Sequence, residues 1–244
     1  MMIDRETAVH ASQKFRLMRN GNIVTLISLT VILANAILAL VLIWSNPFSF
    51  FLTGGIKILG IFMLLSGIAV LIGGLMYVVG LYGLRDVRPE CKDAFSCEIV
   101  LIALVIVGGL AGSESVLGKI LSIITTLGTL VVLWLVIVGT RYLLENLEQD
   151  EILRQGKILW WLNFTSTILA RMYALLPMPT DKGTGAIILL SVGVAISAFS
   201  IVAAVYYVNY LGRVANALEA QNLKQAVEAL EEENFFRSIA TVIQ

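Results

Sequence analysis

The sequence predicts an all-α fold: a polytopic helical membrane protein with about six transmembrane helices in three hairpins, followed by a C-terminal amphipathic helix. Three observations predict this fold class. Of the 244 residues, 58% are hydrophobic and 14% are charged, whereas charged residues make up about 25% of a soluble domain. With a mean hydropathy of +0.89, the chain has more apolar residues than one small globule could bury. Several runs of about 20 apolar residues are long enough to cross about 30 Å of hydrocarbon.

The chain begins with a polar segment, residues 1–22, that precedes the first apolar run. This segment lacks the compact basic start and the short apolar core of a cleaved signal peptide. We therefore expect it to lie in the cytoplasm, and we expect the first span to act as its own uncleaved insertion signal.

Length and hydropathy predict four spans directly: residues 23–44, 56–84, 120–140 and 186–211. A fifth span, residues 158–176, is predicted at about the minimum length for a membrane crossing. Residues 99–112 form the shortest apolar run and are bounded by Glu98 and Glu114. This sixth segment would cross the membrane only as a short or tilted helix in a thinned region of the bilayer.

The positions of the basic residues favour six spans, because lysine and arginine accumulate in cytoplasmic loops. With six spans and both termini in the cytoplasm, 13 of the 17 basic residues lie on the inner side. The outer side then holds Lys57, Lys119 and Lys182, with Arg171 close by. If residues 99–112 turned back without crossing, this bias would nearly vanish. We therefore predict an integral, multi-pass protein whose transmembrane domain covers residues 23–212.

Small residues within the spans mark the expected helix contacts, because helices associate in lipid by close packing. We expect these contacts within the bundle rather than at a dimer face. The candidate residues are Gly108 with Gly112, Gly67 with Gly74, and the row Ser191, Ala195 and Ala198.

Residues 213–244 are predicted to form a cytoplasmic amphipathic helix, since apolar residues recur there at helical spacing: Val214, Leu218, Leu223, Val227 and Leu230. Such a helix lies on the membrane surface or docks on a protein. Its acidic residues, Glu228 and Glu231 to Glu233, would be repelled by anionic headgroups. We therefore expect docking on a protein partner, or on the inner loops of this chain.

The sequence carries no motif that predicts an enzyme, a cofactor or a metal site. It has no nucleotide-binding glycine loop and no nucleophile elbow, and Cys91 and Cys97 lack the further ligands that zinc needs. Residues 232–237 spell EExxxR, which resembles the first motif of the intramembrane CAAX-type proteases, whose glutamate works with histidines in later membrane helices. The one histidine of the chain is His10, in the opposite terminal segment. The net charge of zero also predicts no binding of nucleic acid.

Three polar residues within the predicted spans are candidates for function: Asn35, Asn163 and Arg171. Each asparagine either bonds across helices or lines a solute path. For Arg171 we expect a side chain that snorkels to the membrane surface. In the alternative arrangement it faces the bundle and pairs with Glu114 or Asp181, the acidic residues assigned to the outer side.

Two functions from different classes fit these observations. The first is a transporter for a small molecule or an ion, or a membrane-embedded transport subunit, because polar residues lie within six spans. The alternative is a non-catalytic accessory or assembly subunit of a membrane complex. The C-terminal segment and the lack of a charged cluster within the spans favour this second hypothesis.

Overall fold

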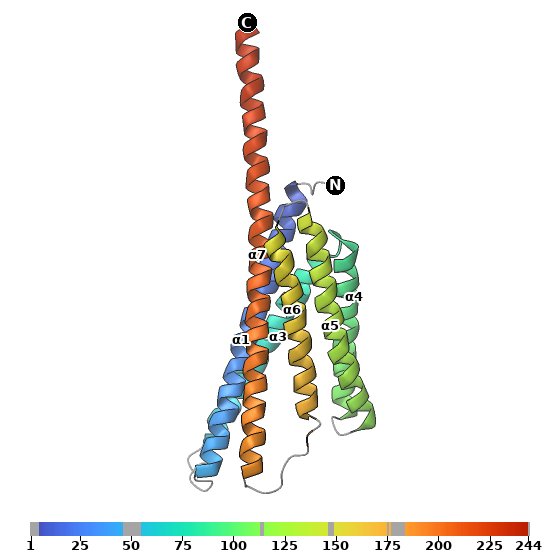
Figure 1. Ribbon diagram of the computed structural model, residues 1–244, viewed down its shortest axis with the longest axis vertical. Helices are drawn as coiled ribbons and strands as arrows, with labels where there is room; N and C mark the ends of the chain where they lie inside the picture. Colours follow the sequence, from blue (N-terminus) through green and yellow to red (C-terminus); the bar gives the residue numbers. More distant parts are fainter. Residues whose placement is uncertain are drawn as a thin grey trace. The chain divides into compact units, whose positions relative to one another are not determined.

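The computed structural model describes residues 5–45, 55–112, 115–145, 149–174, 176 and 184–243. All helices in these ranges are α-helices, and no strand occurs among them, which confirms the predicted all-α fold class (Figure 1). The described residues form six helices: α1 (Arg5–Ser45), α3 (Gly55–Leu84), α4 (Pro89–Ala111), α5 (Val116–Leu144), α6 (Asp150–Ala174) and α7 (Thr184–Ile243).

Within the described residues, five helices are long and apolar enough to cross a membrane. The chain is therefore an integral, multi-pass helical membrane protein. The segment 99–112, which looked short in the sequence, belongs to the 23-residue helix α4 and is among the five. Helix α6 is not among them, because Asn163, Arg171 and several hydroxyl residues lower its hydropathy.

Helices α4 and α5 form an antiparallel hairpin with sharply defined ends (Figure 1). Pro89 occupies the first turn of α4, after Arg88 in an extended conformation, because proline has no N–H to lose there. Gly112 ends α4 with φ of 83°, a conformation that favours glycine. Ser115 caps α5 by accepting a 2.9 Å hydrogen bond from the N–H of Gly118. The turn requires glycine at 118, since a Cβ there would lie 2.1 Å from the carbonyl oxygen of Gly112.

The chain divides into two compact units, and the division crosses four of the helices. Unit 1 comprises residues 1–16, 80–157 and 210–244, and unit 2 comprises residues 17–79 and 158–209. Unit 1 contains the α4–α5 hairpin and a core of fully buried side chains. Its largest core members are Phe15, Leu81, Leu84, Leu144, Tyr210, Leu211 and Leu218.

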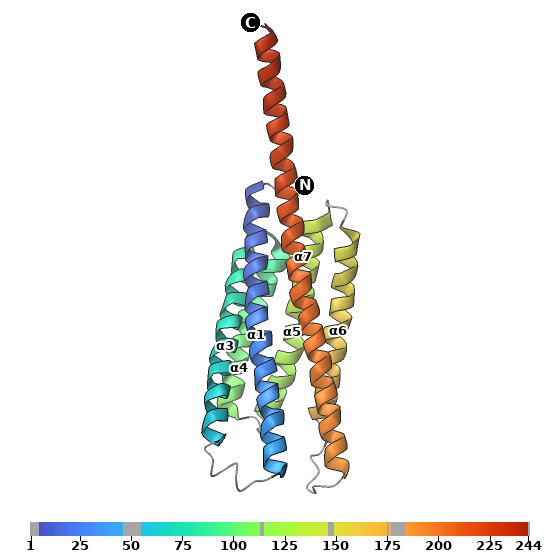
Figure 2. The same cartoon turned by 90° about the vertical axis from the view of Figure 1, so that its left-hand side faces the viewer.

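In unit 2, α1 and α3 run side by side and approach most closely at two glycines (Figure 2). A Cβ built on Gly21 would lie 2.5 Å from the carbonyl oxygen of Gly73, and one built on Gly73 would lie 2.6 Å from that of Gly21. These backbones touch because neither residue carries a side chain. The sequence did not single out this pair, since Gly21 stands in the polar stretch "RNGN" before the first apolar run.

The helix contacts predicted from small residues were wrong at several positions. No atom lies within 4 Å of a Cβ built on Gly67 or Gly74, and Ala195 and Ala198 are exposed. Ser191 is exposed too, but it has an interaction partner. A Cβ on Gly108 would meet Leu121 of the same hairpin at 3.5 Å, while Gly112 ends α4. Small residues permit close approach on any face of a helix, so their spacing alone does not tell which face packs.

Helix α7 is continuous over 60 residues, about 90 Å at 1.5 Å per residue. The predicted last span and the predicted C-terminal amphipathic helix are therefore one helix, with no break near residue 212. The single glycine at this junction, Gly212, is buried and lies within the helix. Similarly, α1 already begins at Arg5, so most of the N-terminal segment 1–22 is helical.

Candidate functional site

The three predicted polar residues lie on α1 and α6, and each is half-buried. The side-chain Nδ2 of Asn163 donates a 3.0 Å hydrogen bond to the carbonyl oxygen of Leu159, one turn earlier in its own helix. This bond satisfies one amide donor within α6. Asn35 lies in the second half of α1.

Arg171 occupies the last turn of α6, between exposed Ala170 and exposed Met172. Its side chain is more covered than those of its two neighbours, and it is not without an interaction partner. The predicted partners Glu114 and Asp181 lie outside the described residues, so their pairing with Arg171 stays a prediction. A partly exposed charge pair contributes about 0–1 kcal/mol.

A second group of polar residues joins α6 to α7 in unit 2. The hydroxyl groups of Ser166 and Ser200 are 2.7 Å apart and share a hydrogen bond, and Ser166 is buried. About two turns away along both helices, Tyr173 packs on Gly193, where a Cβ would lie 2.5 Å from the phenol oxygen. Each hydroxyl bond between helices contributes about 0.6 kcal/mol on average.

Helices α3 and α7 contact each other through a pair of tyrosines. The phenol oxygens of Tyr77 and Tyr207 are 3.1 Å apart, and their rings meet edge to face at 6.5 Å between centroids. Ser200 and Tyr207 are seven residues apart, so both project from one face of α7. We call Tyr77, Ser166, Tyr173, Ser200 and Tyr207 the polar seam. The regular spacing on α7 was the sequence signal for the seam, but hydroxyl residues were not treated as candidates.

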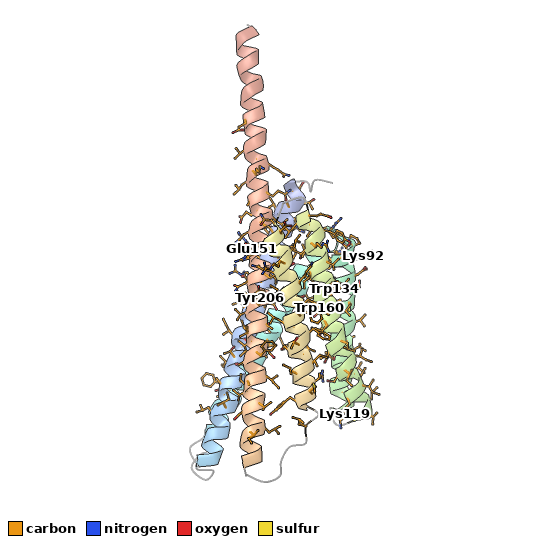
Figure 3. All side chains as sticks on the ribbon, viewed as in Figure 1. Lys92, Lys119, Trp134, Glu151, Trp160 and Tyr206 are labelled. Carbon is orange, nitrogen blue, oxygen red and sulfur yellow. The ribbon has the colours of Figure 1, made fainter. Side chains whose placement is uncertain are left out.

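In unit 1, the middle of α7 is tied to α1 and α6 by polar side chains. The Ser12 hydroxyl donates a 3.0 Å hydrogen bond to the carbonyl oxygen of Ala215. Arg16 pairs with Glu219. Arg213 pairs with Glu151 at 2.6 Å, and Figure 3 shows Glu151 near the start of α6. Since both ion pairs are substantially exposed, they position the helix more than they stabilise it.

C-terminal to these contacts, α7 carries exposed apolar side chains on a face other than the one that packs in unit 1. Val214 and Leu218 are fully buried in unit 1, whereas Leu223 is 62% exposed and Val227 is 53% exposed. With 3.6 residues per turn, Leu223 lies about 140° around the helix from Leu218, and Val227 about 180°. We call Leu223 and Val227 the distal stripe. It faces away from the side by which α7 packs on its own chain.

Comparisons with protein-family models, with curated proteins and with solved structures give no match for this chain. Among the described residues, no group of three histidine, cysteine or acidic side chains is placed to hold a metal ion. The interpretation of the site therefore depends on the polar seam and the distal stripe.

Proposed function

We propose that this protein is a non-catalytic accessory or assembly subunit of a membrane complex, and that it holds its partner through the distal stripe of α7. The observation that carries the proposal is the change of face along α7. Val214 and Leu218 pack on the chain itself, while Leu223 and Val227 present apolar surface to the other side. We place Leu223 and Val227 outside the bilayer, where exposed apolar surface on a helix is typical of helix-in-groove recognition.

The length of α7 supports the same proposal. About 20 residues suffice to cross the hydrocarbon, and α7 has 60. If the membrane part ends near Leu211, roughly 30 residues continue beyond it, about 45 Å of helix. Such a segment reaches well past the headgroups, where a protein partner is accessible.

The sidedness of this segment is part of the proposal. We place the distal part of α7 and both termini in the cytoplasm, because 13 of the 17 basic residues then lie on the inner side. The acidic residues Glu228 and Glu231 to Glu233 would keep the segment away from the anionic cytoplasmic leaflet. Docking on protein rather than on lipid follows from this repulsion.

The test combines site-specific crosslinking with disruption of the stripe. A photo-crosslinking amino acid at position 223 or 227, introduced in cells, should give a discrete higher-mass adduct. The same group at Gln225, which points about 200° away from Leu223, should not. The double change Leu223→Gln with Val227→Gln should leave abundance and melting temperature unchanged. It should also shift the protein from a large species to its solitary form on native electrophoresis.

The control for the double change is Gln225→Ala, which preserves the helix and should leave the large species intact. Equal crosslinking at all three positions, or a wild-type protein that already migrates alone, would contradict the proposal.

A transporter or transport subunit is the second candidate, and the polar seam favours it. Hydroxyl groups on facing sides of α3, α6 and α7 could border a path for a polar solute or an ion. The double change Ser166→Ala with Ser200→Ala separates the two functions. If the protein acts as a subunit through the distal stripe, the complex should persist with little change. Loss of the cellular function with the complex intact would favour transport.

A further inference from the structure

The α4–α5 hairpin contains a groove of about 420 Å³ that neither proposed function uses. Its walls are mainly apolar, and its floor is open because two consecutive glycines replace larger side chains on α4. No atom lies within 4 Å of a Cβ built on Gly109. The lining residues include Leu104, Gly108 and Gly109 of α4, and Leu121, Ser122 and Thr125 of α5.

The groove begins at the turn of the hairpin and runs inward along both helices. Gly109 lies two residues before the end of α4, and Gly118, another lining residue, is the third residue of α5. Exposed Lys119 follows directly, and Figure 3 shows it at this end of the hairpin. Lysine at the end of a membrane helix marks the depth of the headgroups. The groove therefore opens at the interface and extends into the hydrocarbon.

The surface around the groove is apolar and open. Leu110 is 85% exposed, Val116 is 76% exposed and Val105, in the groove wall, is 60% exposed. The Thr125 hydroxyl donates a 3.1 Å hydrogen bond to the carbonyl oxygen of Ser122, so this group is satisfied within its own helix. A water molecule needs two to four polar partners to be held. Hydrocarbon is therefore the better filling for this groove.

We infer that the groove binds a phospholipid, with one acyl chain lying between α4 and α5 and the phosphate next to Lys119. The apolar walls match the chain, and the lysine ammonium group complements the phosphate charge. The order of these features along the hairpin, charge at the interface and apolar groove below it, is the order of a phospholipid. A helix of another protein would match the groove but would have no use for the charge.

The test uses the purified full-length protein in a mild detergent, with native mass spectrometry to count bound lipid. The probes are dioleoyl phosphatidylglycerol and dioleoyl phosphatidylcholine. Gly109 lines the groove and a Cβ there meets no atom within 4 Å, so Gly109→Leu places its side chain in the groove. Because the leucine side chain takes the place of part of the acyl chain, and each lost carbon contact removes about 0.1–0.2 kcal/mol, losing about ten contacts should weaken both lipids about tenfold. The matched control is Gly74→Leu on α3, where a Cβ also meets no atom within 4 Å.

A charge variant separates the contribution of the headgroup to binding from that of the acyl chain. Lys119→Gln should weaken phosphatidylglycerol roughly fivefold and phosphatidylcholine less, because choline already offsets the phosphate charge. Val105→Phe, from the exposed wall of the groove, is a second filling variant that should act like Gly109→Leu.

Three results would overturn the inference. The first is unchanged binding of both lipids in Gly109→Leu and Val105→Phe. The second is equal loss in the Gly74→Leu control. The third is loss of a protein partner on native electrophoresis with lipid binding unchanged, since a partner helix would then be the occupant of the groove.

Discussion

Arg171 is the residue whose surroundings decide between a structural and a functional role. It is half-buried, has an interaction partner and lies in the last turn of α6. Because a charge interaction at this exposure contributes about 0–1 kcal/mol, we expect small effects from two changes. Arg171→Lys keeps the long stem and the charge, and Arg171→Leu replaces them with a side chain that lipid accepts. Both variants should melt in detergent within a few degrees of the wild type.

This prediction would be contradicted if neutralising an acidic residue restored a loss of stability in Arg171→Leu. If Arg171→Leu lost much of its thermal stability, and Asp181→Asn or Glu114→Gln restored it, Arg171 would be holding a buried carboxylate. Removing one partner of such a buried pair costs about 3–5 kcal/mol.

At this scale the sequence singled out candidate polar residues but not the polar seam. Asn163 and Arg171 stood out because amide and charged groups are rare in hydrocarbon. The seam residues Ser166 and Ser200 did not stand out. Serine within a helix can bond its own backbone, as the Ser197 hydroxyl does with the carbonyl oxygen of Gly193 at 2.8 Å. Which serine bonds across helices depends on the packed face, and that is a tertiary property.

At the scale of the helix, adjacent glycines of α3 make a matched test of the α1–α3 contact. Gly73→Ala would place a Cβ 2.6 Å from the carbonyl oxygen of Gly21 and 2.3 Å from the hydroxyl oxygen of Thr25. We expect this overpacking to cost about 1–3 kcal/mol and to lower the melting temperature in detergent. Gly74→Ala meets open space, so it should be neutral or should stabilise the helix by up to about 1 kcal/mol.

Equal melting temperatures for the two alanine variants would show that α1 and α3 do not touch at Gly73. A loss in Gly74→Ala alone would place the contact on the face of α3 about 100° away from Gly73.

Hydropathy predicted where the membrane helices lie but not where they begin and end. The lengths of the apolar runs located a segment of every helix that the structure describes. The start of α4 at Pro89, ten residues before the predicted segment, depends on the proline in its first turn and not on apolar content. The continuity of α7 was missed for a related reason. A change from apolar to amphipathic pattern near Gly212 looks like a boundary, but helix propensity persists across it.

At the scale of the whole molecule, a multi-pass membrane protein ends in a long helix with an exposed apolar stripe. The sequence predicted the membrane class from its 58% hydrophobic residues, its mean hydropathy and its apolar runs of about 20 residues. It could not predict the direction in which Leu223 and Val227 face. That direction depends on the burial of Val214 and Leu218 in the core of unit 1.

The sidedness of the distal stripe is the central claim, because a partner can dock only on the side where the stripe lies. Native Cys91 is unsuitable as a reporter, since it is 1% exposed and packs on Gly139. Cysteines at exposed Lys92, Lys119 and Lys224, each introduced alone after Cys91 and Cys97 are replaced by alanine, report instead. Figure 3 shows Lys92 and Lys119 at opposite ends of the α4–α5 hairpin.

The deciding measurement is labelling of these three variants in intact cells with a membrane-impermeant thiol reagent, repeated after permeabilisation. With the distal part of α7 in the cytoplasm, Lys119→Cys should react in intact cells. Lys92→Cys and Lys224→Cys should react only after permeabilisation. Reaction of Lys224→Cys in intact cells would place the distal stripe outside and contradict the account.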